Sequence, residues 1–236
     1  KKMVILPMNS SVIIVAAGNS TRFKGEIPKQ YVKINNEAIL NMTVRKFINL
    51  DQIRYIQPVI NIKHENIYNK TIKNLKSLKN FKKILPPCFG GNERSISVKN
   101  GLIAISKLKD NPNKVLIHDA ARPFISEQII KNVINKLELY DAVLPCINIV
   151  DTVWKIEKNV FKFLSNRSSY YRAQTPQGFN FKKILEAHLK NSEPWAYDDI
   201  YLANKNNFTI MPVSGSDFNI KITKPEDLEI AERYLK

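Results

Sequence analysis

Positively charged side chains follow a run of small residues near the start of the chain. The stretch VIIVAAGNSTRFKGEIPKQ (12–30) opens as an apolar, β-branched run, passes through AAG and then carries Arg22 and Lys29. Small residues let backbone N–H groups approach a ligand closely. Arginine grips phosphate oxygens through a planar set of donors, and lysine supplies a compact point charge. The stretch therefore indicates a nucleoside triphosphate site, with a surface salt bridge as the alternative for either cation.

Two further segments carry residues suited to polyanion chemistry. GGNERS (90–95) combines two glycines with the start of a predicted helix, and a helix N-terminus favours an anion. A plain loop into a capped helix is the alternative. HDAARP (118–123) places Asp119 at the end of a buried strand, where a carboxylate is costly unless it pairs or binds a cation. Magnesium held by Asp119 and substrate phosphates suits this position, and a structural pair with Arg122 is the alternative.

These groups fit transfer to a phosphorus centre, which needs in-line positioning and surrounding cations more than covalent help from the protein. The first loop has neither the GxGxxG fingerprint nor a GxxxxGK[ST] loop, so dinucleotide binding and a P-loop fit poorly. The sequence shows no Ser–His–Asp or Cys–His constellation of the kind used in acyl transfer. The three histidines are scattered without ligand spacing, which argues against a zinc site.

Strand-like and helix-like segments alternate at a spacing typical of a parallel sheet. Strands are predicted at 11–17, 56–62, 81–86, 114–118, 141–146, 208–215 and 219–223. Helices are predicted at 38–50, 65–78, 95–108, 126–139, 179–191, 198–206 and 224–236, with Ser95 and Ser126 as expected N-caps. We therefore expect an α/β fold with a mostly parallel sheet and helices on both faces. Ligands of such sheets bind beyond the carboxyl ends of the strands, where the three segments above and NIKIT (219–223) would meet.

The regular rhythm breaks after residue 146. The segment 147–164 alternates around EKN (157–159), which is typical of a hairpin. It is too long for a plain connection, so we interpret it as a protruding arm for dimerisation, with an extra antiparallel pair on the sheet edge as the alternative. The simplest organisation is a single domain over 1–236 with 147–172 as the dimerisation arm.

The composition is that of a basic globular protein. The 236 residues are 44% hydrophobic and carry a formal net charge of +16, with lysines spread along the whole chain instead of gathered in runs. No apolar run reaches the roughly 18 residues of a membrane span, and the N-terminus lacks the apolar region of a signal peptide. We expect a cytoplasmic protein with no nucleic-acid or membrane partner. A non-catalytic, basic nucleic-acid-binding module is the remote alternative.

Six motifs occur in a fixed order: AAGNSTRF…PKQ, GGNERSISV, HDAARPF, QTPQGF, YDD and NIKITKPEDLEIAE. Together they resemble the 2-C-methyl-D-erythritol 4-phosphate cytidylyltransferase family over about residues 11–235. The resemblance implies a Rossmann-like nucleotidyltransferase fold of the GT-A type. It also implies that CTP and methylerythritol 4-phosphate react, with magnesium on the triphosphate, to give the CDP-linked alcohol and pyrophosphate for isoprenoid precursor synthesis.

The resemblance implies roles for individual residues. The catalytic cations at the triphosphate would be Arg22, Lys29 and Lys221. The CTP site would comprise Ala16, Ala17, Gly18, Gly91, Asn92, Ser97, Asp119 and Ala120, with Asp119 beside the ribose and the metal. The methylerythritol phosphate site would comprise Arg122, Thr152, Arg167, Thr175, Tyr197 and Asp198. In the family, the arginine matching Arg167 reaches across from the partner subunit, so a homodimer formed through the arm would complete the site.

Two positions depart from the family pattern. The family often has Asp at the position of Asn92 and usually has Thr at the position of Tyr197. The first change would remove a carboxylate contact to the cytosine amino group, and the second would reshape the pocket of the second substrate.

Two related enzymes bear on the resemblance. Ribitol 5-phosphate cytidylyltransferases are the alternative, but they more often have AGG and HDAVRP where this chain has AAG and HDAARP. In some bacteria the cytidylyltransferase is fused to 2-C-methyl-D-erythritol 2,4-cyclodiphosphate synthase, and this chain would match the N-terminal part of such a fusion.

Overall fold

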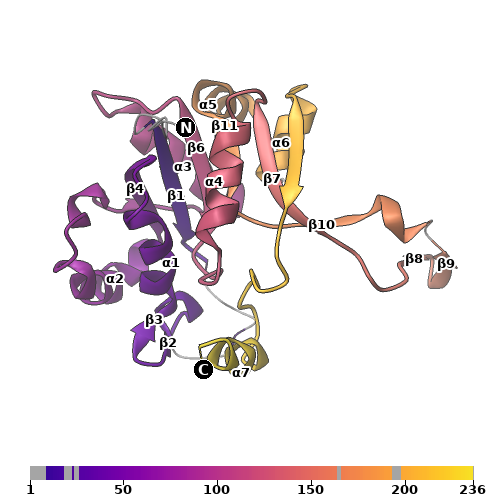
Figure 1. The fold of residues 1–236 in the computed structure, drawn as a ribbon, viewed down its shortest axis with the longest axis horizontal. Coiled ribbons are helices and arrows are strands. Elements are labelled where there is room, and N and C mark those ends of the chain that lie inside the picture. The colour runs from indigo at the N-terminus through magenta and orange to yellow at the C-terminus, as the bar shows by residue number, and fades with distance from the viewer. Residues whose placement is uncertain (1–8, 19–22, 24–26, 164–165, 193–197, 236) are drawn as a thin grey trace, which may run out of the picture.

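The computed structural model describes residues 9–18, 23, 27–163, 166–192 and 198–235. An eight-stranded mixed sheet forms the centre of the molecule (Figure 1). Its strands are β1 (Ser10–Ala16), β4 (Ile53–Ile60), β5 (Cys88–Phe89), β6 (Lys114–Asp119), β7 (Ala142–Asn148), β10 (Tyr171–Ala173), β11 (Gln177–Asn180) and β12 (Ile210–Ser214). The strand order is β10-β7-β11-β6-β1-β4-β5, and β12 also pairs with β7. The ladders from β6 to β5 and between β7 and β12 are parallel, whereas β10 and β11 run antiparallel to their neighbours.

Helices cover both faces of this sheet. They are α1 (Ile39–Ile48), α2 (Glu65–Ile72), α3 (Arg94–Ser106), α4 (Glu127–Lys136), α5 (Phe181–Lys190), α6 (Asp199–Lys205) and α7 (Glu226–Arg233). Alternate residues of a strand face opposite sides. Accordingly, Val12 and Ile14 of β1 pack with α1, α2 and α4, and Ile13 packs with α3, α5 and α6. The predicted fold class is confirmed, and β1 is apolar throughout its centre because both of its faces are covered.

The strand predicted at 81–86 is wrong. Its first half is a short 3₁₀ helix, and Ile84 makes only an isolated bridge to Ile56. Pro86 and Pro87 lack the N–H groups that a strand ladder needs, so regular pairing begins only afterwards, in β5.

The strand predicted at 219–223 is also wrong. This segment belongs to no strand, and the N–H of Ile222 donates to the oxygen of Ala121, just beyond β6, at 2.9 Å. The Ile222 side chain is fully buried in a small cluster with residues of α1 and α7. The segment therefore lies against the loop that follows β6, where it can deliver side chains to the carboxyl end of the sheet.

Several element boundaries differ from the sequence predictions. Strand β11 was not predicted, because its QGFN sequence includes residues that strands disfavour. The helix expected at 95–108 starts at Arg94, with Glu93 in place of Ser95 at the N-cap position. The Ser126 cap is confirmed, since its Oγ accepts from the N–H of Ile129 at 3.3 Å. α2 and α7 are shorter than the predicted 65–78 and 224–236.

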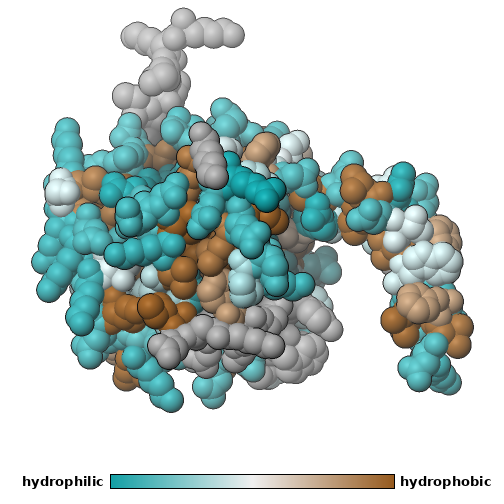
Figure 2. All heavy atoms as spheres, turned by 90° about the horizontal axis from the view of Figure 1, so that it is seen from below, coloured by the Kyte–Doolittle hydropathy of each residue, from teal (hydrophilic) through white to brown (hydrophobic). Residues whose placement is uncertain are grey.

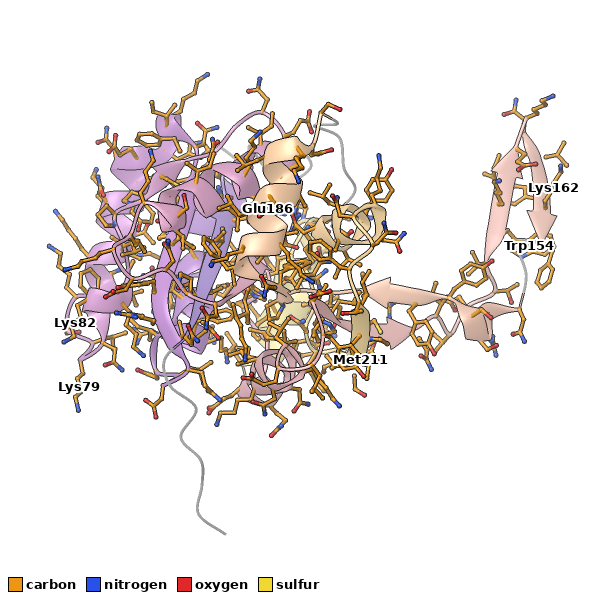
Figure 3. The ribbon with its side chains drawn as sticks, turned by 90° about the horizontal axis from the view of Figure 1, so that it is seen from above. Lys79, Lys82, Trp154, Lys162, Glu186 and Met211 are labelled. Carbon is orange, nitrogen blue, oxygen red and sulfur yellow. The ribbon has the colours of Figure 1, made fainter. Side chains whose placement is uncertain are left out.

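The arm is a hairpin that stands away from the body of the molecule (Figures 1 and 3). Its strands β8 (Trp154–Glu157) and β9 (Val160–Phe163) pair with each other in a sheet of their own. Lys158 and Asn159 join them with φ angles of 50° and 63°, the left-handed pair that a two-residue type I′ turn requires. The predicted hairpin is confirmed, and the alternative of an extra pair on the sheet edge is wrong. Within the described residues, no helix has the length and apolar character needed to cross a membrane.

Gly178 tests the packing of α4 on the sheet. A Cβ at this position would lie 2.5 Å from Cγ1 of Val133 and 2.8 Å from Cδ1 of Leu137. We predict that Gly178→Ala lowers the free energy of unfolding by about 1–3 kcal/mol, because the helix must move outward. Gly18→Ala is the matched control, since a Cβ there meets no atom within 4 Å. Guanidinium unfolding of both variants measures the effect, and equal stabilities would contradict the packing described.

Candidate active site

A cavity of about 510 Å³ opens where β1, β4 and β6 end. It is lined by Val15, Ala16, Ala17, Gly18, Lys29, Gln30, Asn61, Gly91, Asn92, Glu93, Arg94, Ser97, Asp119, Ala120, Ala121, Lys221 and Thr223. The eight residues expected at a CTP site are all among them, together with the two expected cations Lys29 and Lys221. The cavity lies where parallel α/β sheets bind ligands, beyond the carboxyl ends of the strands.

Gln30 holds the loop after β1 in place. Its side chain is almost fully buried and donates to the backbone oxygens of Ala16, at 2.8 Å, and Gly18, at 3.2 Å. The neighbouring Lys29 donates from Nζ to the oxygen of Ile222 at 2.8 Å. One short 3₁₀ turn, Lys29–Tyr31, thus connects the first loop to the segment that carries Lys221.

The loop after β5 packs closely on the first loop. A Cβ at Gly90 would lie 2.4 Å from Cβ of Ala17 and 2.6 Å from Oγ of Ser97, so only glycine fits there. Gly91 donates its N–H to Ser97 Oγ at 3.2 Å, and that hydroxyl donates to the oxygen of Glu93 at 3.1 Å. The wall between Gly91 and the first turn of α3 is therefore held in shape by Ser97.

Asp119 is the electrostatic centre of the cavity. Its carboxylate lies 2.9 Å from Nζ of Lys221, 3.4 Å from Nε of Arg122 and 3.5 Å from Nε of Arg94. Burial alone would raise the pKa of Asp119, but the three cations together hold that pKa well below its usual range. The expected pair with Arg122 exists, and it is one part of a larger cluster.

The segment 219–223 is anchored so that Lys221 faces Asp119. The side-chain amide of Asn219 donates to the oxygen of Thr175 at 2.9 Å. Arg122 donates from Nη1 to the oxygen of Asn219 at 2.7 Å. These bonds replace the sheet ladder that the sequence suggested, and they hold the chain at Asn219, two residues before the lysine.

A buried His118 supports the cluster from beneath. Thr175 Oγ1 accepts from the N–H of Asp119 at 3.2 Å and lies 3.0 Å from Nδ1 of His118. Nε2 of His118 lies 3.1 Å from the oxygen of Arg122. These contacts suit a neutral ring that is protonated on Nε2, with Nδ1 accepting from the threonine. Thr175, expected at the second substrate, is buried here and its hydroxyl is used within the protein.

Arg94 belongs to the site although the sequence reasoning did not select it. It is the first residue of α3, lines the cavity, and donates from Nη1 to Oδ2 of Asp199 at 2.6 Å. Asp199 in turn lies 3.2 Å from Nε2 of His188. The available signal was its position in GGNERS, three residues after Gly91, since a helix start at a strand-end loop faces the ligand.

Two residues expected at the second substrate lie on the arm. Thr152 and Arg167 are exposed, and neither lines the cavity of its own chain. Arg167 donates from Nη1 to the oxygen of Val150 at 2.6 Å, which holds the base of the arm together.

Asp198 caps α6. Its Oδ1 accepts from the N–H of Tyr201 at 2.8 Å and its Oδ2 accepts from the side chain of Gln177 at 2.8 Å. Both oxygens of its carboxylate are thus hydrogen-bonded within the protein, and Asp198 is not one of the residues that line the cavity. Arg22 and Tyr197 lie outside the described residues.

The donors at this site do not form a metal cage. Within the described part of the chain, no group of three or more His, Cys, Asp or Glu side chains could hold a metal ion. The expected metal ligand Asp119 already contacts three cations. Magnesium therefore stays a prediction.

The sheet topology and the strand-end cavity define a nucleotidyltransferase fold. A family model described as IspD, 2-C-methyl-D-erythritol 4-phosphate cytidylyltransferase, matches residues 10–236. The chain belongs to this family, which confirms the resemblance drawn from its motifs.

Individual relatives agree with the family match. The 2-C-methyl-D-erythritol 4-phosphate cytidylyltransferase of Clostridium botulinum (strain Loch Maree / Type A3) is 39% identical over 230 residues, which cover 96% of this chain and 97% of that protein. The bifunctional enzyme IspD/IspF of Wolbachia pipientis wMel is 35% identical, with 94% of this chain and 54% of that protein covered. The chain thus spans about half the length of its bifunctional relatives. The crystal structure of 4-diphosphocytidyl-2C-methyl-D-erythritol synthase from Anaerococcus prevotii DSM 20548 has a TM-score of 0.81 at 29% identity, covering 96% of this chain and 95% of that one.

His118 provides a test of the support beneath the site. Burial lowers its pKa from 6.5 to about 4, more than the bond to the Arg122 oxygen and the charge of Asp119 raise it. Between pH 6.5 and 4 the imidazole is therefore protonated in the unfolded chain but not in the folded chain. The free energy of unfolding falls as the pH is lowered through this range, by up to about 3 kcal/mol. When the free energy of unfolding, measured with denaturant, is plotted against pH over this range, the slope should be shallower for His118→Gln than for the wild type. Parallel slopes would contradict the buried neutral imidazole.

Proposed function

We propose that this chain transfers a cytidylyl group from CTP to 2-C-methyl-D-erythritol 4-phosphate, releasing pyrophosphate, in isoprenoid precursor synthesis. The observation that carries the proposal is the strand-end cavity, where the small-residue loop Ala16–Gly18 faces Lys29, Lys221 and the Asp119 cluster. Family membership supports the same substrates.

The reaction needs one bond to form and one to break. An oxygen of the substrate phosphate attacks the α-phosphorus of CTP, and the bond from that phosphorus to the oxygen bridging to the β-phosphorus breaks, so that pyrophosphate leaves. Negative charge increases on the equatorial oxygens and on the leaving group. Lys29 and Lys221 reach the cavity from two different segments, and we propose that they, with Arg22, stabilise this charge.

We propose that magnesium enters with the nucleotide. A hard divalent ion suits triphosphate oxygens, and it would neutralise part of their charge when bound. Asp119 supplies a carboxylate at the cavity, but its charge is already balanced by three cations. In this proposal Asp119 chiefly fixes the positions of the cations, and the nucleobase lies along the wall formed by Gly91, Asn92 and Ser97.

We further propose that the second substrate is bound with help from the arm of a partner copy. One face of the hairpin is apolar, because the cross-strand pairs Trp154–Phe163 and Ile156–Phe161 share it. These four residues are 53–66% exposed in the part of the chain that the structure describes. Apolar side chains gather on the arm in Figure 2. An exposed apolar face of this kind is typical of an interface, and Thr152 and Arg167 lie on the same arm.

The cysteines suit a cytoplasmic location, which we propose for the protein. Cys88 and Cys146 are both unpaired, as expected in a reducing compartment.

Pyrophosphate release tests the proposed function. With CTP and magnesium, release should require 2-C-methyl-D-erythritol 4-phosphate and should not occur with ribitol 5-phosphate. Release with ribitol 5-phosphate alone would support cytidylyl transfer but contradict the proposed acceptor substrate. No release with either, together with a salt-dependent affinity for polynucleotide, would favour the basic nucleic-acid-binding module.

Lys29 should act mainly in the transition state. We predict that Lys29→Ala lowers kcat by about 100-fold or more and changes the KM for CTP much less, because charge on the phosphates grows during the reaction. Arg22→Ala should behave alike. Lys33→Ala, an exposed lysine nearby, is the matched control. Equal and small changes in kcat and KM would rule out this role for Lys29.

Mixed dimers test the arm. Arg167→Ala should raise the KM for the alcohol phosphate and leave CTP binding unchanged. When Arg167→Ala and Lys29→Ala chains are mixed in equal amounts and assayed at a low concentration of the alcohol phosphate, a cross-subunit site leaves one intact site in each mixed dimer, so activity should recover to about a quarter of the wild-type level. Activity that stays at the level of the two parents would show that each arm serves its own chain or that no dimer forms.

A further inference from the structure

Two adjacent aspartates of the YDD motif have different tasks. The family resemblance placed Asp198 at the second substrate, yet its two carboxylate oxygens hold the start of α6 and the side chain of Gln177. The next residue, Asp199, is 1% exposed and binds Arg94, which lines the CTP cavity. We infer that Asp199 is a positioning residue for CTP binding that acts through Arg94 and is itself held by His188. The inference rests on the proposed function.

Both carboxylate oxygens of Asp199 are used. Oδ2 accepts from Nη1 of Arg94 at 2.6 Å, and Oδ1 lies 3.2 Å from Nε2 of His188, which is 2% exposed. A buried carboxylate is costly unless it is paired and fully hydrogen-bonded. Burial would raise the pKa of Asp199, but Arg94 and His188 lower it, so the group stays ionised. Pairing with Arg94 offsets the cost of burying the Asp199 carboxylate, and it also fixes the guanidinium of Arg94 at the cavity.

The three groups come from three helices that lie on one face of the sheet. Arg94 starts α3, His188 lies near the end of α5, and Asp199 starts α6. The core cluster on this face joins the same three helices. Because Asp198 fixes the beginning of α6, the next side chain is directed inward to Arg94. The packing of α5 and α6 therefore determines the position of the Arg94 guanidinium at the cavity.

Arg94 is held on two sides by carboxylates. Its Nη1 is bound by Asp199, and its Nε faces Asp119 at the longer distance of 3.5 Å. Asp119 is shared with Arg122 and Lys221, so it is the weaker of the two anchors. An arginine whose plane is already fixed loses little conformational freedom when it binds an anion. With Asp199 in place, Arg94 presents its guanidinium to the nucleotide in a defined orientation.

The test measures CTP affinity and steady-state kinetics for Asp199→Asn, which removes the charge and keeps the shape. The dissociation constant and the KM for CTP should rise about tenfold, as expected for loss of a charge-assisted hydrogen bond. The KM for methylerythritol phosphate should change little. Asp141→Asn is the matched control. Asp141 also accepts charge-assisted hydrogen bonds, from Lys183 and Thr209, but it is not one of the residues that line the cavity.

A double-mutant cycle separates positioning from general stability. If Asp199 acts through Arg94, adding Asp199→Asn to Arg94→Ala should cause no further loss of CTP affinity. Independent, additive losses would overturn the inference, and so would unchanged affinity in Asp199→Asn with only a lower melting temperature. If Asp199→Asn does not fold, His188→Gln replaces it, with a smaller rise in the CTP dissociation constant expected and no rise contradicting the inference. Absence of CTP binding in the wild type would overturn the proposed function instead.

Discussion

The buried carboxylate of Asp119 and the three cations around it organise the site. Each cation comes from a different segment: Arg94 from the start of α3, Arg122 from the loop after β6, and Lys221 from the segment 219–223. Without the carboxylate, three positive charges would face one another in a partly buried space. With it they remain close together and leave a net positive cavity, which is the electrostatic condition for binding a triphosphate.

The fold supplies what this cluster needs by ending its parallel strands at one edge. β1 and β6 are neighbours, so the loop Ala16–Gly18 and Asp119 meet directly. Beneath them, neutral His118 and Thr175 satisfy the backbone N–H of Asp119 and the oxygen of Arg122 without adding charge. The arm lies apart from this arrangement. It stands away from the body and exposes an apolar face, as the proposed interface with a second copy of the chain requires.

Much of this was predictable from the sequence because it depends on local pattern. Continuous apolar runs identified β1 and β6, and the small-residue turn and the strand-end aspartate marked the cavity. The turn residues of the arm hairpin were equally clear. The remainder depends on tertiary contacts. The segment 219–223 has the composition of a strand but finds its hydrogen bonds in loops, and the assignment of Asp199 to Arg94 depends on how α5 and α6 pack, which no local pattern reports.

A crystal structure of the protein with bound CTP tests the central claim most directly. The account predicts the triphosphate between the loop Ala16–Gly18 and the lysines Lys29 and Lys221, with Arg94 in contact with the nucleotide and the base along Gly91–Ser97. A nucleotide bound elsewhere would contradict it. So would an empty cavity, with its cations still paired to Asp119, in crystals that contain a saturating concentration of CTP.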